Sequence, residues 1–368
     1  MDSVSMAMSE GDTWKRHRRA ASRPLAETNL DKLVPMIIRL GEDMVGKLKQ
    51  LADEKGVITW KPVNDVQLLG MRVAAAVYMG ETDPLSSEYA LFSHNVQGEV
   101  RELIMHIFSI SLKPSRILYH DRLIYRLLFP GVRESARKWR GINSKLLEDI
   151  RRNKKAAPRD SDLPKSVPRS SAGQLNETEL SHNLIMYLGA GGETAASAIV
   201  RLMQYFCKFP EIQTRARAEA TSIRELSAHS VYDMPYIEAC LMETIRLNPS
   251  PPMELVRALV DCKVAGKPVK AGTKLIFPLT QIQRKVYTDG DEFRPERWLV
   301  PGAHSIDEKL RTEFVGFGFG PRQCPGRYLA VKEVVTIIAL LLPMVNKMYP
   351  FEDSSEVYPL NVSRDYLE

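Results

Sequence analysis

The chain has 368 residues, of which 44% are hydrophobic, and it carries a formal net charge of +6 at pH 7. This apolar share is ordinary for a soluble globular protein and is sufficient for a large core. The positive charge favours acidic partners or a membrane surface and argues against nucleic acid, because no aromatic residues are interleaved with the basic ones. The longest apolar run, VVTIIALLLPMV, is shorter than a membrane span, which needs about 20 residues.

Helical periodicity dominates the first part of the chain. Helices are predicted, in chain order, at Glu27–Gly56, Val63–Met79, His94–Leu112 and Gly131–Arg152. The following segment, residues 152–175, is basic, rich in proline and serine and poor in apolar residues. This composition predicts an exposed, flexible connection.

The second part begins with a long apolar segment. Its length and polar start predict a buried central helix over residues 175–209, which ends before Pro210. Shorter helices are predicted at Glu211–Arg224 and 234–247, and short strands within residues 255–279, where Gly266 and Gly272 mark turns.

The four cysteines, at positions 207, 240, 262 and 324, are widely spaced and form no C-x-x-C pair. A zinc site or a disulfide framework is therefore not expected, and a reducing compartment is the default. Cys324 differs from the other three in its surroundings, because it follows two glycines and precedes a predicted helix. Amide N–H groups at a helix N-terminus stabilise a thiolate, and glycines let the backbone approach the sulfur.

The segment from Phe317 to Gly326 reads F-G-x-G-x-R-x-C-x-G, with Arg322 as its arginine, and it resembles the haem-ligand loop of the cytochrome P450 family. The resemblance implies that Cys324 is the axial thiolate ligand of the iron of haem b. It also implies that Phe317, Arg322 and Gly326 belong to the cofactor site. An inert buried cysteine is the alternative, and it would leave this glycine-rich frame unexplained.

Within the predicted central helix lies the sequence Ala190-Gly191-Gly192-Glu193-Thr194. Two adjacent glycines in a helix interior cost about 1–2 kcal/mol relative to alanines, so another interaction must offset them. The stretch resembles the family's A-G-x-[DE]-T motif, in which Ala190 and Gly191 lie on the haem face, Thr194 hydrogen-bonds dioxygen and Glu193 helps to relay protons. The alternative is close helix packing at the glycines, with Thr194 bonded back to its own helix.

Glu243 and Arg246 are three residues apart on a predicted helix that also carries apolar residues, so an unpaired charge there would be costly. They match the family's E-x-x-R pair, and Arg297 in FRPERW matches its third partner. The implied role is structural, as a brace for the loop of Cys324. The motif ends in Trp298, where the family commonly has phenylalanine.

Trp14 and Arg18 are four residues apart, so both can face one ligand from a single helix. In the family this W-x-x-x-R pair meets a haem propionate, and Arg257 matches a further propionate-binding arginine. A solvated or reductase-facing basic surface is the alternative for this cluster.

The resemblance implies a mainly α fold with small β-sheets, as a single domain over residues 1–368. It implies a monooxygenase that takes NADPH-derived electrons from NADPH–cytochrome P450 reductase and oxidises an apolar small molecule, in specialised-metabolite biosynthesis or lipid metabolism. The location that the resemblance implies is the cytosolic face of the endoplasmic reticulum membrane, with the cytosol as the alternative because the given sequence shows no anchor. A membrane surface is therefore a candidate partner and nucleic acid is not.

Relatives carry a membrane anchor, most of a first sheet and a substrate-lining loop before the W-x-x-x-R helix, and these do not fit before Trp14. The chain is therefore expected to be partial at its N-terminus, either as a shortened gene product or because its true start was missed. Two alternatives stay open: a catalytically impaired haem-binding remnant, and a basic scaffold that binds acidic proteins or membranes.

Overall fold

The computed structural model describes residues 5–7, 9–22, 24–53, 56–60, 62–79, 141, 144, 175–348 and 358–362. These residues belong to two compact units, each built from two stretches of the chain. The first unit takes in Met1–Met36 and Gln67–Glu193, and the second takes in Ile37–Val66 and Thr194–Glu368. The helices predicted at 94–112 and 131–152 and the connection predicted at 152–175 lie, apart from residues 141, 144 and 175, outside the described part. The single domain over 1–368 stays a prediction.

The first unit contains α1 (Gly11–Ser22), α2 (Glu27–Leu30), most of α4 (Pro62–Met79) and the first half of α9 (Glu177–Lys208). Several polar contacts attach α1 to α9. The guanidinium of Arg16 donates to both carboxylate oxygens of Glu179, over 2.6 and 2.5 Å, and the buried His17 ring lies 3.2 Å from the Asn183 amide. The helices predicted at Val63–Met79 and 175–209 are confirmed as α4 and α9.

The single helix predicted at Glu27–Gly56 is wrong in extent. The chain forms α2, a turn at residues 31–33 and then α3 (Val34–Lys49), and it leaves the helical conformation before Gly56. The physical reason is Pro35, which has no N–H to donate to the preceding turn and is accommodated in the first turn of a new helix. Gly56, with φ of +72°, then turns the chain into strand β1 (Val57–Trp60).

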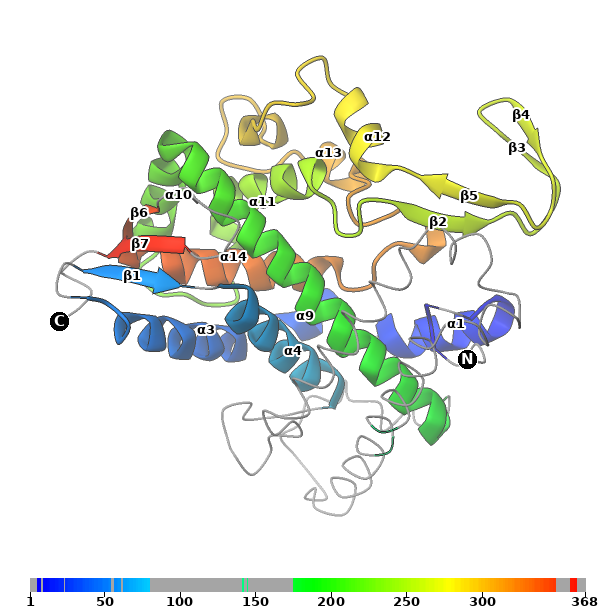
Figure 1. Cartoon of the computed structure of the whole chain (residues 1–368), viewed down its shortest axis with the longest axis horizontal. Helices are drawn as coiled ribbons and strands as arrows, with labels where there is room; N and C mark the ends of the chain where they lie inside the picture. The colour runs from blue at the N-terminus through cyan, green and yellow to red at the C-terminus, as the bar shows by residue number, and fades with distance from the viewer. Residues whose placement is uncertain are drawn as a thin grey trace. The chain divides into compact units, whose positions relative to one another are not determined.

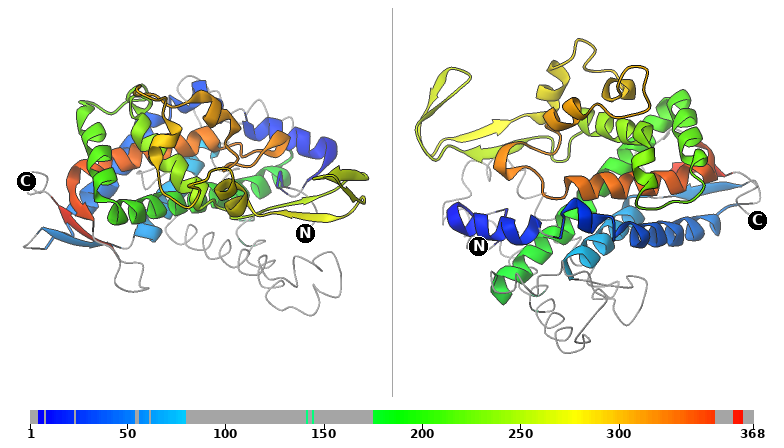
Figure 2. Two further views of the ribbon diagram at one scale, coloured as in Figure 1. Left: turned by 90° about the horizontal axis from the view of Figure 1, so that it is seen from above. Right: turned by 180° about the vertical axis from the view of Figure 1, so that it is seen from behind.

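The core of the second unit is formed by α10 (Pro210–Ser222), α11 (Pro235–Leu247) and α14 (Arg327–Met344), and both α10 and α11 pack against α14. Figure 2 shows these three helices from two sides, with α14 in orange. Every residue of α11 is buried, which makes it the most enclosed helix of the described part. Each fully buried large aliphatic side chain contributes about 1.5–3 kcal/mol, so α11 is held firmly in place.

Three small sheets belong to the second unit. Strands β1, β7 (Tyr358–Val362) and β6 (Val345–Met348) form an antiparallel sheet in the order β1-β7-β6. Strand β2 (Glu254–Arg257) pairs with β5 (Lys274–Phe277), and β3 (Cys262–Val264) pairs with β4 (Lys267–Val269) at the far end of that ribbon (Figure 1). The predicted turns at Gly266 and Gly272 are confirmed, with φ of +78° and +84°.

Short elements connect these parts. They are η1 (Ser230–Asp233), α12 (Leu279–Lys285), η2 (Pro295–Trp298), α13 (Glu308–Glu313) and η3 (Gly320–Arg322). Helix α9 ends before Pro210, as predicted. Pro210 is also the first residue of α10, where the missing N–H of a proline is tolerated. Among the described residues, no helix combines the length and the apolar character needed to cross a membrane.

Candidate functional site

A buried hydrogen-bond cluster is centred on the Glu243 carboxylate of α11. Arg246 donates to it from Nε and Nη2, over 2.7 and 2.8 Å, and Arg297 Nε donates over 2.9 Å. The indole Nε1 of Trp298 and the backbone N–H of Arg294 add two hydrogen bonds of 2.9 Å. The side chains of Glu243 and Arg246 are 0% and 1% exposed. The structure thus brings Glu243, Arg246 and Arg297 together in one dry cluster.

Arg246 and Arg297 extend this cluster to the segment before η2. Arg246 Nη1 donates to the carbonyl oxygen of Gly290 over 2.7 Å. Only glycine fits at position 290, because an added Cβ would lie 1.7 Å from a backbone carbonyl oxygen. Arg297 Nη1 donates to Asp289 Oδ1 over 3.1 Å, and this hydrogen bond lowers the pKa of the Asp289 carboxyl. Charged hydrogen bonds therefore fix the path of this segment against α11.

Trp298 connects the cluster to the segment that leads to Cys324. Its indole, which is 2% exposed, donates to Glu243 and meets the Phe314 ring edge-on, with centroids 5.1 Å apart. Phe314 in turn meets Phe317 edge-on at 5.8 Å. From the sequence, Trp298 was noted only as a departure from the family pattern. The available signal was chemical, since a buried indole N–H requires an acceptor.

The loop around Cys324 is shaped by glycines. Gly318 and Gly320 have φ of +77° and +66°, which other residues rarely adopt. The backbone N–H of Cys324 donates to the Phe317 carbonyl over 2.8 Å and closes the loop. Gly326 is the N-cap of α14, and an added Cβ there would lie 3.9 Å from Cys324 Sγ. The predicted arrangement, a cysteine just before the first turn of a long helix, is present.

Two elements of the second unit support this loop from the side. An added Cβ at Gly316 would lie 2.7 Å from Ile245 Cγ2, so the loop backbone lies directly against α11. Phe319 meets Phe277 of β5 edge-on, with centroids 5.6 Å apart. The position of the loop is therefore coupled to the helix that carries Glu243 and to the β2–β5 ribbon.

The four cysteines differ in their ability to supply a thiolate. Burial raises the pKa of the Cys207 thiol to about 11 and that of Cys240 well above its ordinary value, so both remain protonated. Cys262 and Cys324 are exposed, and of these two only Cys324 lies beside the N-terminus of a long helix. Its exposed position and its glycine frame fit the axial ligand of a haem iron. No group of three or more His, Cys, Asp or Glu among the described residues could hold a metal ion in another way.

Four of the predicted cofactor-binding residues are divided between the two units. Arg322 lies in η3 and Arg257 at the end of β2, and both are exposed in the second unit with Cys324. Trp14 and Arg18 lie on α1 in the first unit, where both are half-buried. Their helix is confirmed, and their role toward a propionate stays a prediction.

The glycine pair of α9 lies in the first unit and packs against α4. An added Cβ on Gly192 would lie 2.6 Å from Met71 Cγ and 3.0 Å from the Gln67 carbonyl oxygen. At the next glycine, Gly191, it would lie 3.2 Å from the Ala74 methyl. The close helix packing weighed as an alternative from the sequence is therefore present. It offsets the helix penalty of the glycines and leaves the catalytic role of the motif as a prediction.

The remaining residues of the motif lie at the boundary of the two units. Ala190 and Glu193 belong to the first unit and Thr194 to the second, and all three lie on α9. The Glu193 carboxylate Oε2 accepts a hydrogen bond of 2.6 Å from Gln67 Nε2. Sequence reasoning did not find Gln67, because nothing local distinguishes it from other polar residues of α4.

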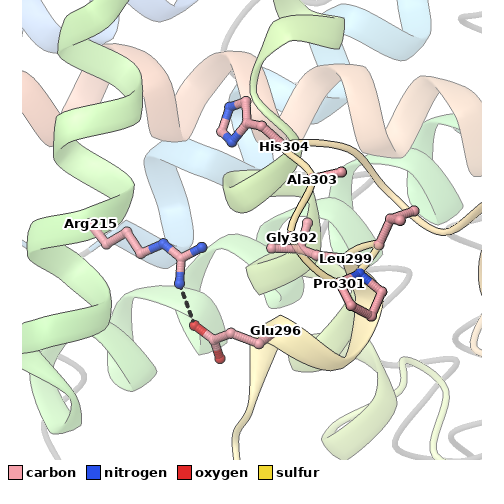
Figure 3. A pocket seen from close by; sticks show the side chains of 8 residues that line it. Arg215, Glu296, Leu299, Pro301, Gly302, Ala303 and His304 are labelled. Carbon is pink, nitrogen blue, oxygen red and sulfur yellow. Dashed lines mark hydrogen bonds and ion pairs between the residues drawn. The ribbon is translucent and has the colours of Figure 1, made fainter.

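A separate cavity of about 580 Å³ lies in the second unit between α10 and the loop after η2 (Figure 3). Arg215 on one wall pairs with Glu296 on the other over 2.8 Å. Beside it, the buried Glu219 of α10 accepts hydrogen bonds of 2.8 Å from the backbone N–H groups of Tyr236 and Ile237, at the N-terminus of α11. No predicted site residue lines this cavity.

A family model described as Cytochrome P450 matches residues 2–346. Cytochrome P450 monooxygenase sphH of Aspergillus fumigatus is 30% identical over 204 residues, which cover 52% of this chain and 37% of that relative. Cytochrome P450 3A15 of Cavia porcellus is 26% identical over 380 residues, with 99% and 73% covered. Cytochrome P450 monooxygenase ABA2 of Pyricularia oryzae is 31% identical over 242 residues, with 61% and 56% covered. The chain thus spans between about a third and three quarters of the length of these relatives.

The family match extends over most of the chain and includes every predicted site residue. The described part is rich in helices and has only small sheets, so the fold class expected from the sequence is confirmed. The chain belongs to the cytochrome P450 family.

Proposed function

We propose that the protein is a haem-thiolate monooxygenase that inserts one oxygen atom of dioxygen into an apolar small molecule. The observation that carries this proposal is the exposed residue Cys324 in its glycine-framed loop at the N-terminus of α14. When bound, a haem with an axial thiolate supplies the oxygen-activating chemistry. The electrons would come from NADPH through NADPH–cytochrome P450 reductase, at the cytosolic face of the endoplasmic reticulum membrane. Apolar substrates of specialised-metabolite or lipid metabolism are the proposed class.

The residues of this chain would share the work of holding the cofactor and moving protons. Cys324 would bind the iron. Glu193 and Thr194 would take protons from solvent and pass them to the reacting oxygen. The side chains and backbone proposed to surround the haem and its propionates are Trp14, Arg18, Ala190, Gly191, Arg257, Phe317, Arg322 and Gly326.

The Glu243 cluster would hold the Cys324 loop in place. The support for this role is a chain of contacts, from Glu243 through the Trp298 indole to Phe314 and Phe317. A loop that presents a ligand must keep its geometry within a fraction of an ångström, and rigid buried neighbours achieve this.

The proposal is tested by Cys324→Ser, with Cys262→Ser, the other exposed cysteine, as the matched control. Wild-type protein and the control should bind haem and give the red-shifted carbon monoxide band of a thiolate-ligated ferrous haem. Cys324→Ser should lose that band, because a hydroxyl is a poor ligand for this iron. A Cys324→Ser protein with an unaltered spectrum would overturn the assignment.

Turnover separates the monooxygenase from a haem-binding remnant. With haem and reductase present, a monooxygenase oxidises NADPH and consumes dioxygen, whereas a remnant shows the spectrum without this consumption. A basic scaffold would show neither.

A further inference from the structure

A partly buried contact links the oxygen-activation segment of α9 to α4 within the first unit. The side chain amide of Gln67 donates from Nε2 to Glu193 Oε2 over 2.6 Å, and Gln67 is only 5% exposed. A hydrogen bond to an ionised acceptor is stronger than one between neutral groups. Gln67 therefore restrains one oxygen of the carboxyl group that is proposed to relay protons.

The backbones of the two helices approach each other at the same turn. An added Cβ on Gly192 would lie 3.0 Å from the Gln67 carbonyl oxygen and 3.2 Å from the Met71 backbone nitrogen. The glycine that precedes Glu193 thus lets α9 lie against the turn of α4 that carries Gln67. Because the helices touch there, the Gln67 side chain reaches Glu193 at a position fixed by backbone contact.

The crossing has further support that does not involve the Gln67 side chain. Gly191 packs against Ala74, where an added Cβ would lie 3.2 Å from the Ala74 methyl. One turn further along each helix, the rings of Tyr78 and Tyr187 stack with centroids 4.1 Å apart. We therefore expect the helix pair to keep its geometry when the amide of Gln67 is replaced.

We propose that Gln67 is a positioning residue for Glu193, whose carboxyl it holds in the orientation needed to pass protons toward Thr194. This inference rests on the proposed function, in which Glu193 belongs to the proton relay. Glu193 is half-buried, so solvent can still supply its proton.

The contact itself is tested without turnover, by a double-mutant cycle on the urea unfolding of the haem-loaded protein. The variants are Gln67→Met, Glu193→Met and the double variant, which replace the polar groups with apolar ones of similar size. A direct charged hydrogen bond predicts a coupling of about tenfold in the unfolding equilibrium constant. Additive effects would show that the two side chains do not interact and would overturn the proposal.

The positioning role is tested by the fate of dioxygen when NADPH and reductase are supplied and no organic substrate is added. Two-electron reduction gives NADPH + H⁺ + O₂ → NADP⁺ + H₂O₂, whereas four-electron reduction gives 2 NADPH + 2 H⁺ + O₂ → 2 NADP⁺ + 2 H₂O. Poorer proton delivery should raise the peroxide share several-fold in Gln67→Met. Gln67→Glu, which replaces the donor with a like charge that repels the Glu193 carboxylate, should raise the peroxide share further.

Met71→Leu is the matched control, because Met71 packs at the same crossing and leaves the hydrogen bond intact. It should keep the wild-type peroxide share. An equal change in Met71→Leu, or no change in Gln67→Met, would overturn the inference while leaving the monooxygenase proposal standing. A wild-type protein that binds haem but oxidises no NADPH would overturn the proposed function, and the inference with it, even where the unfolding cycle shows coupling.

Discussion

The indole N–H of Trp298 donates a 2.9 Å hydrogen bond to Glu243 Oε2, and the same ring packs edge-on against Phe314. One side chain thus belongs both to the buried charge cluster and to the segment that leads to Cys324. Where a phenylalanine could supply only the second contact, tryptophan supplies both.

Trp298→Phe should therefore lower the free energy of unfolding by about 1–3 kcal/mol, because a buried carboxylate oxygen loses one of its donors. The aromatic contact with Phe314 remains, so the haem content should stay near that of the wild type. Urea denaturation and the haem absorbance per protein measure the two effects. Trp60→Phe is a matched control. The indole Nε1 of Trp60 also donates to a carboxylate, that of Asp65 over 2.7 Å, but this hydrogen bond does not involve the segment of Cys324. If Trp298→Phe unfolded at the same urea concentration as the wild type, the hydrogen bond would make no net contribution to the free energy of unfolding.

Glu243→Ala should be far more damaging. It leaves the guanidinium groups of Arg246 and Arg297 buried without their shared carboxylate, which costs about 3–5 kcal/mol. We expect poor folding and loss of haem, measured by soluble yield and by absorbance. Asp12→Asn is the comparison, because the Asp12–Lys15 pair is exposed and its loss should leave the unfolding midpoint unchanged. A well-folded Glu243→Ala protein with full haem content would contradict the structural role of the cluster.

Gly316→Ala should displace the Cys324 loop. The added methyl would lie 2.7 Å from Ile245 Cγ2 and 2.2 Å from the Phe314 ring, and overpacking of this kind costs about 1–3 kcal/mol. We expect reduced haem retention during gel filtration. Gly46→Ala on α3 is the matched control, since nothing lies within 4 Å of its added Cβ, and helix propensity predicts a gain of about 0.5–1 kcal/mol. Equal haem retention in both variants would show that the loop does not need its contact with α11.

Glu333 on α14 should make stability depend on pH. Complete burial raises the pKa of its carboxyl from 4.5 to about 8, and its Oε1 has no hydrogen-bond partner among the described residues. The folded state therefore holds this proton more tightly than the unfolded state. The free energy of unfolding should fall as pH rises from about 4.5 to about 8, by up to about 1.4 kcal/mol per pH unit from this group alone.

Glu333→Gln should remove that slope and stabilise the protein at pH 8, as measured by urea unfolding at several pH values. The exposed Glu313→Gln is the control and should leave the slope unchanged. A slope that persists in Glu333→Gln would assign it to other groups.

Much of the helical fold followed from apolar spacing, because buried helices must place apolar residues on one face. The spacing found α4, α9 and α11 within one or two residues of their ends. It failed at Glu27–Gly56, where the periodicity continued across Pro35 although the backbone hydrogen bonds could not. The E-x-x-R pair and Cys324 were predicted for a different reason, because their short local motifs resemble those of the cytochrome P450 family.

Contacts between distant segments were beyond the reach of the sequence. Gln67 and Glu193 are 126 positions apart, and no local pattern marks a glutamine that will be buried against a carboxylate. Trp298 was visible only as an unusual residue, and its acceptor became evident when α11 and η2 were brought together. Such partners depend on tertiary packing, which single-sequence patterns do not encode.

The carboxylate of Glu219 has a mechanical consequence for the second unit. From the neighbouring helix α10, it accepts hydrogen bonds from the first two backbone N–H groups of α11, those of Tyr236 and Ile237. Helix α11 therefore cannot slide along its own axis without breaking both hydrogen bonds. Glu243 and Arg246 lie farther along the same helix. A disturbance of α10 would accordingly reach them as a translation of the whole helix, with no side chain of α10 needing to touch them.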